Sequence, residues 1–188
     1  MPGLTQENWA VCEHVMRLRT IKKREYLVRQ GQICHYVSFI NHGLLRMYYL
    51  VDGKERITEF FKEEAYCSDY RSFLMREPAL TSIQAMEDTE VVDIAYEDLQ
   101  LLYTQIPEAN IIGRLVAEEL FIDVCKRTTS QASDDLGQQY TDLVNEKPWL
   151  LQRVPQYMIA SYLGITPEAL SRTKARMGRK QPKAALVS

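Results

Sequence analysis

Short, largely apolar runs fill the chain between Glu25 and Ile94, and each ends in residues typical of turns. The clearest pair, LLRMYYLV and ERITEFF, flanks Asp52-Gly53, where glycine permits the positive φ angle of a tight turn between twisted antiparallel strands. We predict further strands in YLVRQG, YVSFI, TSIQA and EVVDIA. So many short strands with regular turns favour an antiparallel sandwich or barrel over a parallel sheet.

The pattern becomes helical at Tyr96. The run EDLQLLYTQIP predicts a short helix that stops before Pro107. From Glu108 to about Thr128 a second, longer helix is predicted, because apolar residues recur at helical spacing. Its broad apolar stripe consists of Ile111, Ile112, Leu115, Val116, Leu120, Phe121, Ile122, Val124 and Cys125. One domain does not easily cover so broad a stripe, so we expect one side to pack on the strands and the other on a second copy of the chain. A helix buried wholly within one core is the alternative.

A polar segment, TTSQASDD, predicts a boundary after this helix, from Thr128 to Asp135. Ser133 or Asp134 can cap the next predicted helix, DLGQQYTDLVNE, which ends before Pro148. Strands therefore give way to helices along the chain, which is typical of the α+β class.

The segment VPQYMIASYLGITPEALSRTKARM predicts two helices joined by a tight turn. Pro155 suits the first turn of the first helix, and Gly164 ends it. Thr166 can cap the second helix, with Pro167 as its first residue. The buried side of the first helix would consist of Ile159, Ala160 and Leu163. A turn of about three residues between two such helices is typical of a helix-turn-helix.

The second of these helices is predicted to have two faces. At 100° per residue, the face turned inward holds Ala169, Leu170, Thr173 and Met177. The polar face holds Glu168, Ser171, Arg172, Ala175 and Arg179. Arg can donate two hydrogen bonds to guanine and Glu can accept one from cytosine, so this face favours DNA recognition. The alternative is a structural hairpin, in which Glu168 and Arg172 only stabilise an exposed helix.

The net charge of the whole chain, −2, is unevenly distributed. After Trp149 the only acidic residue is Glu168, whereas the basic residues there are Arg153, Arg172, Lys174, Arg176, Arg179, Lys180 and Lys183. A basic end on an acidic body favours a polyanion as partner of the C-terminal part. From Lys180 onward, a solvated tail is the preferred interpretation.

Targeting and metal-binding patterns are weak. The start, MPGLTQENW, does not resemble a signal peptide, and no segment approaches the roughly 18 apolar residues of a membrane helix, so we expect a cytoplasmic protein without a membrane partner. The four widely spaced cysteines favour buried thiols, with an iron-sulfur site assembled in space as the alternative; they are Cys12, Cys34, Cys67 and Cys125. The histidines form no metal-binding pair, so we predict no metal site.

These motifs resemble the CRP/FNR family of bacterial transcription regulators over nearly the whole chain. The strongest resemblance lies in IASYLGITPEALSR, where Glu168, Ser171 and Arg172 match the base-reading residues of the oxygen-sensing branch. Gly31, Gly43 and Gly53 match turn glycines of the family. The resemblance implies an α+β fold with an antiparallel β-roll of the double-stranded β-helix or jelly-roll type. It places an N-terminal helix and a cyclic-nucleotide-binding-like β-roll in residues 1–106, a long dimerisation helix in 107–131 and a helix-turn-helix DNA-binding domain in 132–188.

The effector pocket departs from the family pattern. Relatives that bind cyclic nucleotide hold the ribose with a Gly-Glu pair and the phosphate with a later Arg-Ser pair, where this chain has Ser68-Asp69 and Ala79-Leu80. No guanidinium therefore remains at the phosphate position, so this alignment argues against a cyclic nucleotide cofactor, and no other cofactor is indicated.

Other residues could complete such a pocket. Arg71 or Arg76 would have to reach a phosphate from another direction. Thr129 and Ser130 resemble helix residues that face nucleotide in some relatives, although a helix-end role for their hydroxyls is the alternative. The C-terminal QPKAALVS is too short for the β-hairpin wing of the family, so we expect the wing to be reduced or absent.

The sequence thus predicts a sequence-specific transcription regulator that binds palindromic double-stranded DNA as a homodimer. RNA polymerase is a further expected partner, and the existence of a small effector is left open. Glu168 and Arg172 would specify bases, while the remaining candidate DNA contacts are Thr166, Ser171, Lys174, Arg176 and Arg179. A ligand-binding β-roll module without DNA binding is the alternative. An enzyme is not predicted, because Asp69 and Glu64 lack an accompanying nucleophile, base or metal cluster.

Overall fold

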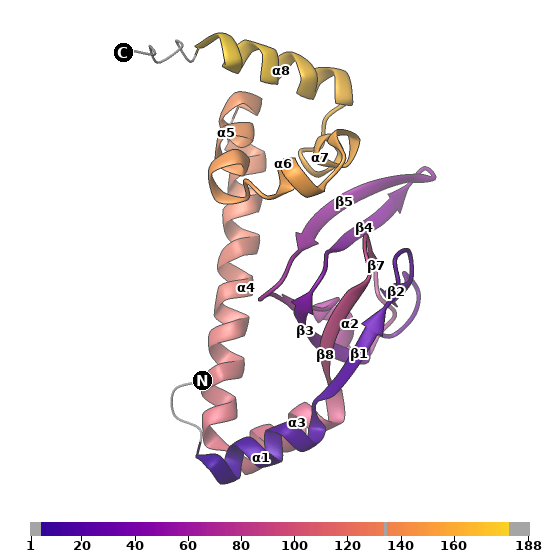
Figure 1. The fold of residues 1–188 in the computed structure, drawn as a ribbon, viewed down its shortest axis with the longest axis vertical. Coiled ribbons are helices and arrows are strands. Elements are labelled where there is room, and N and C mark those ends of the chain that lie inside the picture. The colour runs from indigo at the N-terminus through magenta and orange to yellow at the C-terminus, as the bar shows by residue number, and fades with distance from the viewer. Residues whose placement is uncertain (1–4, 134, 181–188) are drawn as a thin grey trace, which may run out of the picture. The chain divides into compact units, whose positions relative to one another are not determined.

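The computed structural model describes residues 5–133 and 135–180, apart from the side chains of residues 127, 131–133 and 178–180. Contacts within the chain divide it into two compact units, Met1–Glu119 and Leu120–Ser188. The strands lie in the first unit and the helix-turn-helix in the second (Figure 1). The three-part division into residues 1–106, 107–131 and 132–188 stays a prediction.

The first unit contains two four-stranded antiparallel sheets, with strand orders β1-β8-β3-β6 and β2-β7-β4-β5. The strands are β1 (Arg17–Ile21), β2 (Tyr26–Val28), β3 (Tyr36–His42), β4 (Leu45–Val51), β5 (Lys54–Phe61), β6 (Tyr66–Cys67), β7 (Ser82–Ala85) and β8 (Thr89–Ala95). The predicted antiparallel class is confirmed, whereas β1 and β6 were not among the predicted strands. The main core contains Ile21, Ile40, Leu45, Phe73, Ile83 and Val91, all buried.

Two turns explain why glycines stand where they do. Asp52 and Gly53 have φ angles of 50° and 73°, the positive pair that joins β4 to β5 in a two-residue hairpin. Gly43 has φ 111°, and a Cβ at this position would lie 2.5 Å from Oγ1 of Thr89. The backbone between β3 and β4 can therefore pass directly over Thr89 only because residue 43 lacks a side chain.

The helices of the first unit are α1 (Gln6–Val15), α2 (Tyr70–Met75), α3 (Tyr96–Gln105) and the start of α4 (Pro107–Ser133). A small second core joins three of them, with Cys12 of α1 against Leu102, Ile106 and Ala109. The short helix before Pro107 is confirmed as α3, while α2 was not predicted.

Helix α4 is longer than the sequence indicated. It continues through Thr128, where the polar boundary was expected, and ends at Ser133. The predicted helix end at about Thr128 was therefore wrong, because polarity alone does not end a helix, although Ser133 still lies within the predicted boundary segment. Oγ1 of Thr128 donates to the carbonyl of Val124 one turn earlier at 2.8 Å, so the side chain is satisfied within the helix. Among the described residues, no helix is long and apolar enough to cross a membrane.

The second unit continues with α5 (Leu136–Glu146), α6 (Leu150–Arg153), α7 (Gln156–Tyr162) and α8 (Pro167–Lys180). Asp135 caps α5, its side chain accepting from the N–H of Gln138 at 3.0 Å, rather than Ser133 or Asp134 as expected. Helix α8 packs against α5 and α7. The wing prediction for residues 181–188 lies outside the described residues.

Candidate nucleic-acid interface

The turn between α7 and α8 is built as the sequence indicated. Gly164 follows the last turn of α7 with φ 69°, a conformation that glycine adopts without strain. The N–H of Ile165 donates to the carbonyl of Ala160 at 2.9 Å, which fixes the exit from α7. Oγ1 of Thr166 accepts from the N–H of Ala169 at 3.2 Å and so caps α8. These contacts set the angle at which α8 leaves the turn.

Helix α8 has one buried and one exposed face. Leu170 and Thr173 are 1% and 5% exposed, and Oγ1 of Thr173 donates to the carbonyl of Ala169 at 3.0 Å. The exposed residues of the helix include Glu168, Ser171, Arg172 and Ala175. The predicted division of α8 into two faces is therefore confirmed for the described side chains. Arg179 lies in the last turn, but its side chain is outside the described residues.

Glu168 is held as a carboxylate at the start of α8. Its pKa lies below the ordinary value because its own backbone N–H and the hydroxyl of Thr166 hydrogen-bond to it, with a smaller contribution from the positive charge of Arg172. An ionised Glu168 is an acceptor only, which is the state that can accept a hydrogen bond from a cytosine amino group.

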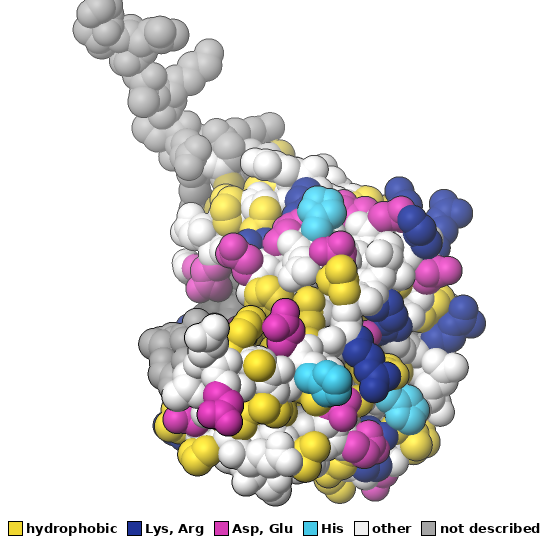
Figure 2. Space-filling view, turned by 60° about the horizontal axis from the view of Figure 1, so that its bottom comes forward, with side chains coloured by type: hydrophobic (Ala, Val, Ile, Leu, Met, Phe, Trp, Pro, Cys, Tyr) yellow, Lys and Arg dark blue, Asp and Glu magenta, His cyan; other side chains and the backbone are white. Residues whose placement is uncertain are grey.

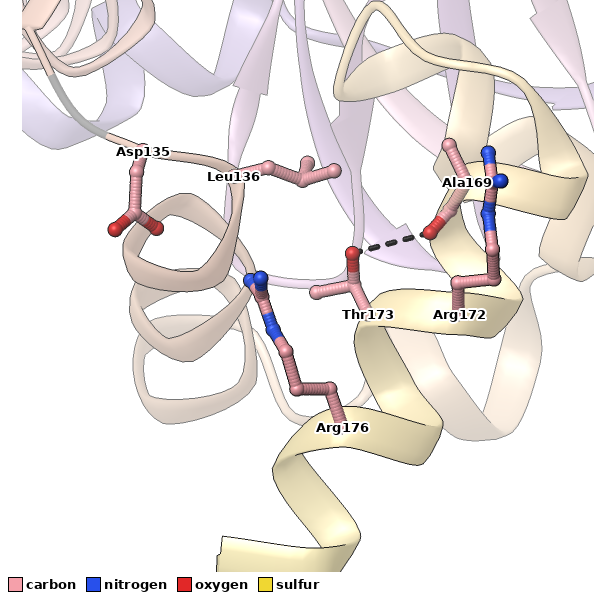
Figure 3. Close-up of a pocket in the computed structure, with 6 residues that line it drawn as sticks. All are labelled: Asp135, Leu136, Ala169, Arg172, Thr173 and Arg176. Carbon is pink, nitrogen blue, oxygen red and sulfur yellow. Dashed lines mark hydrogen bonds between the residues drawn. The ribbon is translucent and has the colours of Figure 1, made fainter.

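Lys174 and Arg176 differ in what surrounds them. Lys174 is a partly buried residue, but its Nζ donates to Oε1 of Gln156, in the first turn of α7, in an exposed hydrogen bond of 2.9 Å. Arg176 is exposed and lines an open hollow of about 520 Å³ between α5 and α8, together with Asp135, Leu136, Ala169, Arg172 and Thr173. Figure 3 shows the Arg176 side chain reaching toward Asp135, while Arg172 lies on the other side of Thr173. Gly137 makes room for it, since a Cβ there would lie 3.2 Å from a terminal nitrogen of Arg176.

The first candidates for the effector pocket, Ser68 and Asp69, are engaged within the first unit. Oγ of Ser68 donates to the carbonyl of Tyr36 at 3.0 Å. Asp69 is buried and caps α2, with Oδ1 accepting from the N–H of Ser72 at 3.1 Å. Its Oδ2 accepts from Oγ1 of Thr81 at 2.6 Å. The Asp69 carboxylate, at the position where relatives hold the ribose, is therefore already bound at both oxygens within the chain.

The neighbouring candidates offer little to a phosphate. Ala79 is 2% exposed, whereas Leu80 is 60% exposed, so the two side chains do not share one surface. Arg71 pairs with Glu77 at 2.5 Å. Arg76 donates to the carbonyl of Cys34 at 3.0 Å and lies over the ring of Tyr96, 4.7 Å from its centroid.

Thr129 and Ser130 lie on α4 in the second unit. Thr129 is exposed, and the carbonyl of Ser130 accepts from Nε2 of Gln139 at 3.3 Å. A role for these residues beside Asp69 stays a prediction.

Helix α4 exposes several apolar side chains, and three of them lie along one side of the helix. Ile111, Leu115 and Ile122 are each about half exposed, at 52%, 52% and 51%. Successive separations of four and seven residues place them within about 40° of one another around a helix with 100° per residue. Phe121 and Val124, also exposed, lie on other sides of the helix.

No group of three or more His, Cys, Asp or Glu side chains within the described residues is arranged to hold a metal ion. Figure 2 shows acidic and basic side chains interspersed over the face that it displays. Three of the cysteines, Cys12, Cys34 and Cys67, are buried, and Cys125 is exposed. Burial raises the pKa of the Cys67 thiol well above its usual value, which is typical of an unreactive thiol.

Two residues that hydrogen-bond to candidate site residues were not identified from the sequence. Thr81 meets Asp69 across a chain separation of twelve residues, and Gln156 meets Lys174 across eighteen. Neither contact has a local sequence signal, because each depends on how two elements pack.

The chain is similar to proteins of known type in sequence and in fold. Residues 18–105 match the cyclic nucleotide-binding domain. The chain is 28% identical over 187 residues to the transcriptional activator protein Anr of Pseudomonas aeruginosa, covering 93% of this chain and 76% of that protein.

Two solved structures share the fold over most of their length. FixK2 from Bradyrhizobium japonicum has a TM-score of 0.75 at 15% identity, covering 91% of this chain and 90% of that one. A regulator of the CRP/FNR family from Eubacterium rectale has a TM-score of 0.72 at 18% identity, covering 94% of this chain and 85% of that one. The chain therefore contains a cyclic nucleotide-binding domain, and it is similar to transcriptional activators in sequence and to regulators of the CRP/FNR family in fold.

Proposed function

We propose that this regulator acts as a homodimer that reads a palindromic DNA site in a sequence-specific way, without cyclic AMP as its effector. The observation that carries the proposal is the exposed face of α8, where Glu168, Ser171 and Arg172 lie opposite the buried Leu170 and Thr173. Such a helix can enter the major groove with its polar face toward the base edges while its apolar face stays packed on the domain.

In this proposal, Arg172 donates two hydrogen bonds to a guanine and the ionised Glu168 accepts one from a cytosine. Thr166, Ser171, Lys174, Arg176 and Arg179 position the protein on phosphates, which gives affinity without sequence preference. Lys174 keeps free donors on its ammonium group while it is bound to Gln156, since one ammonium carries three N–H bonds.

The second copy would pack along α4. A row of half-exposed apolar side chains, Ile111, Leu115 and Ile122, is an unusual surface for an isolated helix in water. Pairing two copies along this row buries it and gives the dimer a two-fold axis, which a palindrome mirrors with half-sites about 34 Å apart.

Cyclic AMP is a poor fit to the β-roll for a physical reason. A cyclic phosphate needs a guanidinium free to bind two of its oxygens, but Arg71 is paired with Glu77, and Arg76 is bound to Cys34 and stacked on Tyr96. A different small effector, contact with RNA polymerase and a cytoplasmic location complete the proposal. It assigns no catalytic step to the chain.

Selection of binding sites from random duplexes at low salt tests this proposal directly. We expect an enriched palindrome, and titration of that duplex should give the same affinity with and without cyclic AMP. A large gain in affinity with cyclic AMP would contradict the effector part of the proposal. No enrichment by a folded, dimeric protein would contradict DNA recognition and favour a ligand-binding β-roll module.

A further inference from the structure

The segment from Asp69 to Thr81 is closed by hydrogen bonds within the chain. Asp69 is buried, and its Oδ1 accepts from the N–H of Ser72 at the start of α2. Its Oδ2 accepts from both Oγ1 and the backbone N–H of Thr81, at 2.6 and 3.3 Å. One carboxylate therefore joins the start of α2 to the residue that precedes β7.

Further hydrogen bonds hold the middle of α2 and the residue that follows it. Oγ of Ser72 accepts from the N–H of Cys34 at 2.9 Å and donates to the carbonyl of Glu77 at 2.6 Å. Arg76, the residue after α2, donates to the carbonyl of Cys34 at 3.0 Å. These side chains tie α2 to the segment around Cys34 and to the residues that follow the helix.

Aromatic contacts continue from α2 to α3 and α4. The ring of Tyr70 stacks on Phe73 with centroids 6.2 Å apart, and Phe73 meets the edge of Tyr96, the first residue of α3, at 5.4 Å. Further along α3, the ring of Tyr103 lies directly on α4, since a Cβ at Gly113 would be 2.7 Å from its Cζ. A shift of α2 would therefore move α3 through the contact of Phe73 with Tyr96. Helix α3 in turn contacts α4, which carries Ile111 and Leu115, through Tyr103.

We propose that Thr81 is a positioning residue that, through Asp69, holds α2, α3 and α4 in the arrangement that binds DNA. The inference rests on the proposed function. Its physical basis is the buried carboxylate of Asp69. Without the Thr81 hydroxyl, Oδ2 loses its shorter bond and keeps only the longer one from the backbone N–H, and a buried carboxylate that is less well satisfied favours a rearrangement that restores the lost bond.

The test compares Thr81→Val, which has nearly the same shape but no hydroxyl, with Thr81→Ser, which keeps it. Thr104→Val is the matched control, because Thr104 is exposed on α3 and its hydroxyl donates only to the carbonyl of Leu101. The full chain is used, and two quantities are measured: amide hydrogen exchange of residues 70–75 and affinity for the selected palindrome. Asp69→Asn is the second variant, because it keeps a capping oxygen for Ser72 but puts an NH₂ group against the backbone N–H of Thr81, where two donors meet.

We expect Thr81→Val to exchange faster in α2 and to bind the palindrome about fivefold or more weakly, a usual size for coupling between distant sites. Thr81→Ser and Thr104→Val should match the wild type in both measurements. Asp69→Asn should show the same changes as Thr81→Val, and it tests the same contact if Thr81→Val does not fold. Faster exchange with unchanged DNA affinity, or unchanged exchange, would overturn the inference. Failure of the proposed function looks different, because the wild type itself would then select no duplex, and exchange would still decide whether Thr81 holds α2.

Discussion

Lys174 and Gln156 join the two helices of the helix-turn-helix, with Nζ of Lys174 2.9 Å from Oε1 of Gln156. Because the bond is exposed, we expect Gln156→Ala to change the free energy of unfolding by less than about 1 kcal/mol, as measured by denaturant titration.

Lys174→Ala should have a similarly small effect on unfolding but should weaken binding to all duplexes alike. It should also reduce the slope of log affinity against log salt by about 1, since one phosphate contact is lost. DNA titrations at several salt concentrations measure this slope. An equal loss of DNA affinity in Gln156→Ala would show that Lys174 acts by joining α7 to α8 instead of by contacting phosphate.

Arg172→Ala should cost about 1–3 kcal/mol of binding free energy on the selected palindrome and relax the preference at one base position. Arg172→Lys should restore little of it, because an ammonium lacks the planar fork that binds guanine through two atoms. Repeating the site selection with each variant measures both effects. Arg176→Ala is the comparison, expected to weaken cognate and scrambled duplexes equally, and wild-type binding by Arg172→Ala would refute the base-reading role.

The double variant Leu115→Glu, Ile122→Glu should convert the proposed dimer to a monomer. Two carboxylates per copy would otherwise be buried without partners where the two α4 helices pair. Analytical ultracentrifugation measures the change. The control is Val124→Glu, which is similarly exposed but lies about 180° from Leu115 around α4 and should leave the dimer intact. Dissociation by Val124→Glu alone would place the interface on a different side of the helix.

The helix-turn-helix could be predicted in detail because its signals are local. Gly164, Thr166 and the spacing of Leu170 and Thr173 each act within one turn of the chain, so the sequence alone locates the cap, the break and both faces. The hairpin at Asp52-Gly53 was predictable for the same reason.

Elements stabilised by distant contacts were missed. Strand β6 is only two residues long and exists because Ser38 and Phe39 of β3 pair with it. Helix α2 depends on Asp69, whose second partner, Thr81, is brought near only by the fold. The pocket prediction named Asp69 from its place in the chain but could not reveal that its carboxylate was already bound, since that depends on the approach of two loops.

Gly43→Ala should destabilise the first unit by about 2 kcal/mol or more, because the new Cβ would lie 2.7 Å from the Cα of Thr89 and the φ angle of 111° is strained for alanine. Gly31→Ala is the matched control, with φ 86° but no atom within 4 Å of the new Cβ. It should cost about 1 kcal/mol. Thermal unfolding of both variants separates the steric effect from the backbone effect, and equal losses would contradict the proposed clash.

Tyr48 should make stability fall in alkaline solution. Burial, followed by the hydrogen bond with Tyr26, raises the pKa of Tyr48 from 10.0 to about 12. The raised pKa belongs to the folded state, so between pH 10 and 12 the unfolded chain loses this proton more readily than the folded protein. The contribution of Tyr48 to the free energy of unfolding is therefore complete below pH 10 and is lost as the pH rises toward 12. Melting temperatures across this range should fall less steeply for Tyr48→Phe than for the wild type. The exposed Tyr49→Phe should keep the wild-type slope, and identical slopes for all three proteins would contradict the assignment to Tyr48.

Strand β5 ends the sheet β2-β7-β4-β5, so one side of it has no neighbouring strand within the described residues. Unpaired peptide groups along such an edge can recruit a strand from another molecule and begin aggregation. Charged residues crowd this edge, namely Lys54, Glu55, Arg56 and Glu59. A strand arriving from another copy would meet these charges and would have to remove them from water. We therefore expect this edge to resist sheet-to-sheet aggregation when the protein is concentrated, which keeps it from competing with the proposed pairing along α4.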